Sequence, residues 1–120
     1  MLPKDKTAVF VYNILKIILD NLVYLKAISA YQEALQIFTL KKYPEDYART
    51  QSFMANAFLQ MSDIRNKEEN LNYAINANLE ALEVYKPDNN SEQCARVSLN
   101  LGVTYGNLAK IGDQGKNLQN

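Results

Sequence analysis

Residues 27–58 read AISAYQEALQIFTLKKYPEDYARTQSFMANAF, and residues 74–105 read AINANLEALEVYKPDNNSEQCARVSLNLGVTY, a gapless repeat at an offset of 47 residues. A period of this size is typical of helical arrays, in which each unit buries its apolar face against its neighbours. The sequence therefore predicts an all-α protein of antiparallel helical hairpins stacked as a short α-solenoid, with residues 27–65 and 74–111 as the repeated units. The identical positions of the first copy are Ala27, Ile28, Ala30, Glu33, Ala34, Leu35, Glu45, Ala48 and Arg49.

The composition predicts one small domain over residues 1–120 and argues against an enzyme. Thirteen basic and thirteen acidic residues cancel, so the chain lacks the positive charge that phosphate binding needs, and we expect no nucleic-acid partner. The sequence contains no histidine, which removes the commonest general base and metal ligand. We therefore expect no catalytic residue, cofactor or metal. The single cysteine, Cys94, cannot form an internal disulfide and suits a reducing compartment.

Proline, glycine and capping residues set the expected helix boundaries. Helix is permitted from the N-terminal region to about residue 40, either unbroken or split at Asp20–Asn21. Pro44 followed by two acids predicts a helix start, because proline fits the first helical turn and acids favour the positive end of the helix dipole. That helix should run to about residue 65, and the next should cover about residues 70–85. The last helix should cover about residues 92–111 and end at Gly112 and Gly115.

The segment 7–25 is apolar on nearly every side, which predicts burial among other helices or against another chain. Its apolar run, Val9 to Leu19, is interrupted by Asn13 and Lys16 and is shorter than the roughly 20 apolar residues that span a bilayer. We therefore expect a soluble, cytoplasmic protein without a membrane partner. Two interpretations remain open: the segment caps the first hairpin, or it makes a homo-oligomer, most simply a homodimer. The self-association residues would be Val9, Phe10, Ile14, Ile17 and Ile18.

The small and aromatic positions of the two units resemble those of tetratricopeptide repeats. On the first helix of each hairpin they are Met54, Ala55 and Phe58, and then Leu101, Gly102 and Tyr105; on the second they are Ala27, Tyr31 and Ala34, and then Ala74, Asn78 and Ala81. The period exceeds the usual 34 residues of the family, and the string from Tyr43 to Gln51 resembles the long-period variant of prokaryotic arrays. The resemblance implies a scaffold that binds proteins.

In this family the first helices line a concave groove. The resemblance therefore implies a groove that binds a peptide or a partner helix, and the arginines favour an acidic or C-terminal ligand. The alternative is a solvated face with salt bridges to Glu45 and Glu92. A second class of function is a regulatory or accessory subunit of an enzyme whose active site lies on another chain. The groove residues would be Arg49, Ser52, Asn56, Gln60, Arg96, Leu99, Val103 and Asn107.

Two single residues and one helix face complete the expectations. Asn78 falls in an apolar stripe, so its amide should be hydrogen-bonded or reach solvent. Cys94 should be a small packing residue. The inward face of the last helix should carry Leu101, Gly102, Tyr105 and Leu108.

Overall fold

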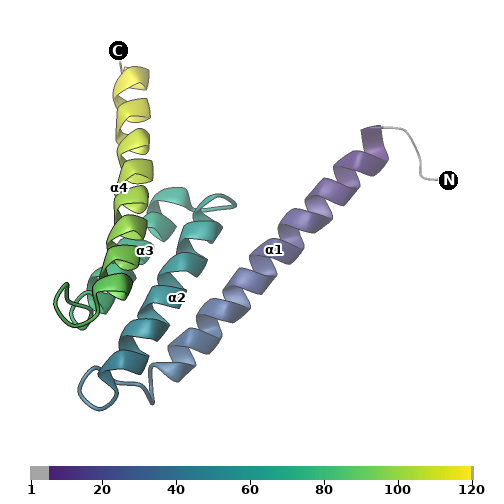
Figure 1. Cartoon of the computed structure of the whole chain (residues 1–120). Helices are drawn as coiled ribbons and strands as arrows, with labels where there is room; N and C mark the ends of the chain where they lie inside the picture. Colours follow the sequence, from purple (N-terminus) through teal and green to yellow (C-terminus); the bar gives the residue numbers. More distant parts are fainter. Residues whose placement is uncertain (1–5, 120) are drawn as a thin grey trace.

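The computed structural model describes residues 6–119, with side chains described over residues 6–114. Within that part of the chain there are four helices and no strand. Figure 1 shows the four helices in chain order, with the N-terminal half of α1 pointing away from the other three. The helices are α1 (Lys6–Ala34), α2 (Pro44–Ser62), α3 (Lys67–Ala81) and α4 (Ser91–Gln119). The predicted all-α class is confirmed.

Local sequence explains where α2 and α3 begin. Pro44 occupies the first turn of α2, and Glu45 and Asp46 follow it at the positive end of the helix dipole. Asn66 precedes α3 in the left-handed conformation, with φ of 45°, which asparagine tolerates better than most residues. The sharp turn at Asn66 brings α3 back along α2, so the two helices form an antiparallel hairpin (Figure 1).

The core lies where α2 is covered on two sides. One cluster joins Ile28 of α1, Met54 and Met61 of α2 and Ala77 of α3, with Tyr31 and Phe58 packed at its edge. The other cluster joins Ala48 of α2, Ala81 and Tyr85 of the α3 end and Val97 of α4. Contacts therefore pass from α1 to α2, from α2 to α3 and from α3 to α4, with a smaller direct contact between α2 and α4.

Helices α1 and α4 differ most from the sequence-based expectations. Helix α1 continues through Asp20 and Asn21 without a break, and it stops at Ala34, where hydrogen-bonded turns such as Tyr43 N–H to the Thr39 carbonyl replace the expected last helical turns. Helix α4 continues through Gly112 and Gly115 to Gln119. A glycine inside a helix costs only about 1 kcal/mol relative to alanine, so it does not have to end one. The prediction of a break at these glycines was wrong.

The inward face of α4 also differs from the expectation. Leu101 and Leu108 are half-buried, but Gly102 and Tyr105 are exposed, and over residues 91–114 the residues that α4 buries are Val97 and Thr104. In the overlay at 47 residues, Gly102 and Tyr105 correspond to Ala55 and Phe58 of α2, which has α1 on one side and α3 on the other. Helix α4 packs mainly on α3, so the equivalent face has no helix over it.

Candidate functional site

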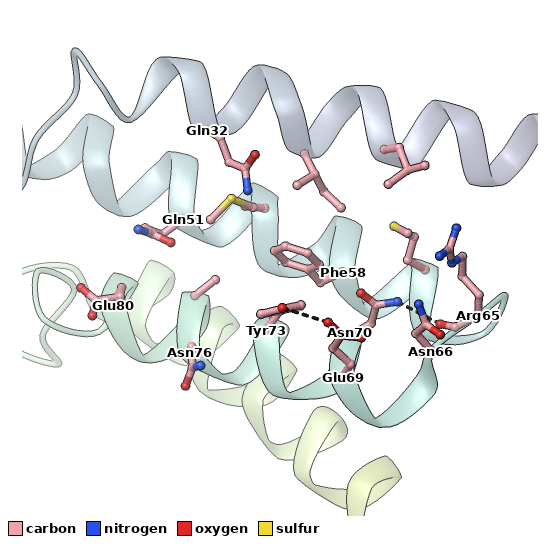
Figure 2. Close-up of a pocket in the computed structure, with 15 residues that line it drawn as sticks. Gln32, Gln51, Phe58, Arg65, Asn66, Glu69, Asn70, Tyr73, Asn76 and Glu80 are labelled. Carbon is pink, nitrogen blue, oxygen red and sulfur yellow. Dashed lines mark hydrogen bonds between the residues drawn. The ribbon is translucent and has the colours of Figure 1, made fainter.

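The α1–α3 pocket carries polar side chains from three helices, among them Gln32 of α1, Gln51 of α2 and Asn70 of α3. It measures about 510 Å³ and lies over α2, between α1 and α3, which do not contact each other. Figure 2 shows Phe58 and Tyr73 inside it, with amide side chains around them. The apolar lining residues are Leu25, Ile28, Met54, Phe58, Met61 and Ala77, and the polar ones are Gln32, Gln51, Arg65, Asn66, Glu69, Asn70, Tyr73, Asn76 and Glu80.

Two hydrogen bonds and one aromatic contact hold the polar rim of the α1–α3 pocket. The Asn70 amide Nδ2 donates to the Arg65 carbonyl at 2.9 Å, which fixes the turn at Asn66. The Tyr73 hydroxyl donates to Glu69 Oε1 at 3.0 Å, and this hydrogen bond raises the pKa of Tyr73. The Phe58 and Tyr73 rings lie 5.1 Å apart between centroids, so the aromatic pair joins the floor to the rim.

Tyr47 of α2 bonds to Glu80 of α3, which lines the α1–α3 pocket. Its hydroxyl donates to Glu80 Oε2 at 2.5 Å. Burial and, second, the hydrogen bond to Glu80 raise the pKa of Tyr47 to about 12. Both causes disfavour the phenolate, because burial penalises any charge and the carboxylate repels a negative one. Tyr47 is therefore a neutral donor that holds Glu80 in place at the rim.

The α2–α4 pocket collects part of the predicted groove. Arg49 and Ser52 of α2 and Arg96 of α4 all line it, and its volume is about 290 Å³. Its other lining residues include Glu45, Tyr85 and Gln93. The structure therefore brings two of the predicted groove arginines, Arg49 and Arg96, to the same pocket. Each arginine is paired with an acid of its own helix.

The arginine pairs are exposed and involve one unexpected partner. Arg49 Nη1 lies 3.0 Å from Asp46 Oδ1, and Arg96 Nη2 lies 3.3 Å from Glu92 Oε1. The predicted pairing of Arg96 with Glu92 is confirmed, but Arg49 pairs with Asp46 and not with Glu45. Glu45 and Asp46 lie four and three residues before Arg49, so both acids are on its side of α2 and compete for it. Arg49 pairs with the nearer acid, Asp46. The arginine side chains remain 57% and 61% exposed, so a ligand can reach both.

The other predicted groove residues do not form a continuous lining. Asn56 accepts a hydrogen bond from Asn100 Nδ2 at 3.0 Å, which closes the space between α2 and α4. Gln60 lines a separate hollow between α1 and α2. On α4, Leu99 and Val103 are exposed and Asn107 is half-buried, and none of the three lines a pocket described here. Of the eight predicted groove residues, only Arg49, Ser52 and Arg96 therefore lie together in one pocket.

The polar rim of the α1–α3 pocket was not predicted from the sequence, although the spacing of polar residues on α3 indicates the part of the rim that α3 provides. Glu69, Tyr73, Asn76 and Glu80 recur at spacings of four, three and four, which places them on one side of α3. Gln32 of α1 also belongs to the rim, but its place there depends on how α1 crosses α2, which the sequence does not show.

Asn78 differs from its expected environment, whereas Cys94 agrees with it. Asn78 is buried to 1% exposure, and its Oδ1 has no hydrogen-bond partner, so the expectation of a bonded or solvated amide was wrong for this atom. Helix packing on both sides of α3 closes off solvent without supplying a donor. Cys94 is a half-buried free thiol packed against the cluster around Val97, as expected for a packing residue.

All five predicted self-association residues are exposed on α1. Val9 and Phe10 are 57% and 63% exposed, and Ile14, Ile17 and Ile18 are 40%, 53% and 56% exposed. In α1 the structure buries only Ile28. The interpretation of residues 7–25 as a cap that folds onto the first hairpin is therefore wrong over the exposed part, because α1 points away from the body there (Figure 1).

Helix α1 is long and apolar enough to cross a membrane, with a mean hydropathy of 1.6 over its most apolar 18 residues. Lys16 and Asp20 fall in this segment, and each would cost about 2.5–3.5 kcal/mol at the bilayer centre. Its eleven Leu, Ile, Val and Phe side chains between Val9 and Leu25 gain roughly 0.3–0.6 kcal/mol each, about 3–7 kcal/mol together. The gain is therefore of the same size as the cost of the two charges, before Asn13 and Asn21 are counted.

Comparison with known proteins gives no match to any family model, curated protein or solved structure. Among the residues whose side chains are described, no group of three or more Cys, Asp or Glu residues could hold a metal ion. The pockets and the exposed half of α1 are therefore the features from which a function can be argued.

Proposed function

We propose that this chain is a protein-interaction module that holds an extended segment of a partner protein in the α1–α3 pocket. The observation that carries the proposal is the pairing of an apolar floor with a rim of amide side chains. Binding sites in proteins combine these two features, because apolar contact supplies affinity and a few polar groups fix orientation. The methionines of the floor, Met54 and Met61, adapt to side chains of different shapes.

The amide rim favours an extended peptide over a helix. Side-chain amides such as Gln32 and Asn76 both donate and accept hydrogen bonds, as the peptide backbone does. An extended segment presents unpaired N–H and C=O groups, whereas a helix bonds its own internally. An apolar side chain of the segment would then sit against Phe58.

The charges around the α1–α3 pocket favour a neutral or weakly basic ligand. Arg65 is outweighed by Glu69 and Glu80 among the lining residues. An acidic segment would face two carboxylates across a pocket with an apolar floor, where charge repulsion is less screened than in water. The proposed ligand of this pocket therefore differs from the acidic ligand expected at the arginines.

The test is peptide capture from an immobilised library of eight-residue peptides, followed by fluorescence polarisation with the best binder. The double variant Gln32→Ala, Asn76→Ala should weaken binding about 10-fold, because each lost hydrogen bond contributes roughly 0.5–1.5 kcal/mol. Gln36→Ala with Asn89→Ala is the matched control, since it removes the same residue types from exposed positions outside the pocket. Equal weakening by both double variants would exclude the pocket, as would the absence of any bound peptide.

The α2–α4 pocket supports a second binding site, for a peptide carboxylate. Arg49 and Arg96 line it together, and their exposed pairs with Asp46 and Glu92 contribute only about 0–1 kcal/mol each, so a ligand can compete for the arginines. Arg49→Ala with Arg96→Ala should weaken the capture of peptides with free C-terminal carboxylates without lowering the unfolding temperature. Lys41→Ala with Lys42→Ala removes the same charge elsewhere. Unchanged capture in the arginine variant would remove this site.

We further propose that the four helices form a tetratricopeptide-like array of the long-period kind and that the module self-associates in the cytoplasm. The identities at the 47-residue offset support the array, as does the matching burial of Ile28 and Ile75, which are both 6% exposed. Self-association is supported by the exposed apolar residues of α1.

A further inference from the structure

The projecting half of α1, defined as residues 9–22, has no protein neighbour that covers its apolar side chains. No residue in this range is buried, and none lines a pocket described here, whereas Val23 and Tyr24 line a hollow with α2. Figure 1 shows this half extending beyond α2, and α1 contacts neither α3 nor α4.

A heptad-like seam runs along one side of the projecting half. Its residues are separated by four, three and four positions, which keeps them on one side of a helix that winds around a partner. No polar residue interrupts the seam, and all of its members are at least 47% exposed. The seam consists of Val11, Leu15, Ile18 and Leu22.

The projecting half of α1 has a second apolar side that the packed half lacks. In the half that packs on α2, Tyr24 and Tyr31 face the core and Glu33 lies exposed on the other side. In the projecting half, Ile17 and Phe10 continue the line of Tyr24, because they lie two and four helical turns before it. The seam lies in line with Glu33. The side of α1 that is polar at Glu33 is therefore apolar along the seam, which indicates that another protein surface covers the seam.

We infer that the seam pairs with the same seam of a second copy of this chain, as a coiled coil formed by the projecting halves. A seam that meets itself is self-complementary, which is what a symmetric contact requires. Pairing leaves Lys16 and Asp20 in water on the outer side, whereas a bilayer would bury both charges. Leucine at Leu15 and isoleucine at Ile18 also allow bundles of more than two copies. The inference deepens the self-association part of the proposed function and does not depend on either peptide site.

Neighbouring isoleucines provide a matched test. Of the five self-association residues expected from the sequence, the seam retains only Ile18, which is 56% exposed. Ile17 is 53% exposed and points about 100° away around the helix, so the seam excludes it. In sedimentation equilibrium across a concentration series, the full chain should have at least twice its single-chain mass of 13.7 kDa. Ile18→Asp should raise the dissociation constant about 100-fold or more, and Ile17→Asp should change it by about threefold or less. Circular dichroism checks that both variants stay folded.

Three results would overturn the inference. The wild-type chain could be a monomer at every concentration, or the two aspartate variants could weaken assembly equally. The wild-type chain could instead bind neutral phosphatidylcholine vesicles, with both variants reducing that binding, which would point to a bilayer. The peptide assay distinguishes the two proposals: Ile18→Asp should still bind peptide, and Gln32→Ala with Asn76→Ala should still assemble. Failure of one property therefore leaves the other standing.

Discussion

Asn78 is a buried amide whose oxygen accepts no hydrogen bond, between two helices that close it off from water. Leaving a buried polar group unpaired costs about 1–3 kcal/mol. Asn78→Leu has a side chain of similar size and no polar atom, so it should raise the free energy of unfolding by about 1–2 kcal/mol in urea denaturation. Asn72→Leu, on an exposed position of the same helix, should change it by about 0.5 kcal/mol or less. A loss of stability in Asn78→Leu would mean that the amide has a role in the native packing.

Tyr47 gives the fold a pH dependence in the alkaline range. Its pKa rises from 10.0 to about 12, so the folded state holds the phenolic proton more tightly than the unfolded state. The associated stability is complete below pH 10 and is lost as the pH rises through 12. Subtracting the absorbance titration of Tyr47→Phe from that of the wild type isolates the ionisation of Tyr47, which should therefore occur near pH 12. Ionisation of that tyrosine near pH 10 would show that the hydrogen bond to Glu80 does not persist in solution.

At the scale of single residues, helix periodicity predicted faces better than partners. Arg49 and Arg96, which correspond at the 47-residue offset, both line the α2–α4 pocket. Periodicity did not predict that Asn56 bonds to Asn100, because that contact depends on the crossing of α2 and α4. Side-chain pairs between helices follow from packing angles, which a single sequence does not contain.

Helix α4 contains three glycines, Gly102, Gly106 and Gly112, that no contact requires. An added Cβ would meet nothing within 4 Å at any of them, and none has positive φ. Gly106→Ala should raise the free energy of unfolding by about 0.5–1 kcal/mol, because alanine loses less backbone entropy in a helix. The measurement is the urea midpoint together with the helical circular dichroism signal. A decrease in stability would mean that another surface approaches α4 closely at Gly106.

At the scale of helices, the sequence predicted which helices exist better than where they end. Pro44 marked the start of α2 correctly, since proline fits only the first turn of a helix. Glycine is a weaker signal: Gly112 and Gly115 lie inside α4, because a helix tolerates a glycine at a modest cost. Asp20 and Asn21 did not split α1 for the same reason, as neither residue prevents helical backbone.

At the scale of the whole molecule, the 47-residue repeat in the sequence did not predict which helix faces are covered by other helices. Phe58 and Tyr105 correspond in the overlay, but Phe58 packs against the core and Tyr105 is exposed. The α1–α3 pocket has the same origin, since it exists because α1 and α3 pack on α2 without touching each other. Residues from three helices meet there, and periodicity within one helix describes only one wall at a time.

The projecting half of α1 predicts an exchange pattern for the whole molecule. Residues 9–22 are exposed except for the half-buried Asn21, and isolated helices shorter than about 12–15 residues are marginal in water. On dilution below the assembly threshold, their backbone amides should therefore lose hydrogen-exchange protection, while the amides of α2 and α3 keep theirs. Ile18→Asp should show the unprotected pattern at every concentration, and Ile17→Asp should behave as the wild type. Protection of residues 9–22 that does not change with concentration would mean that a contact within one chain stabilises this half of α1.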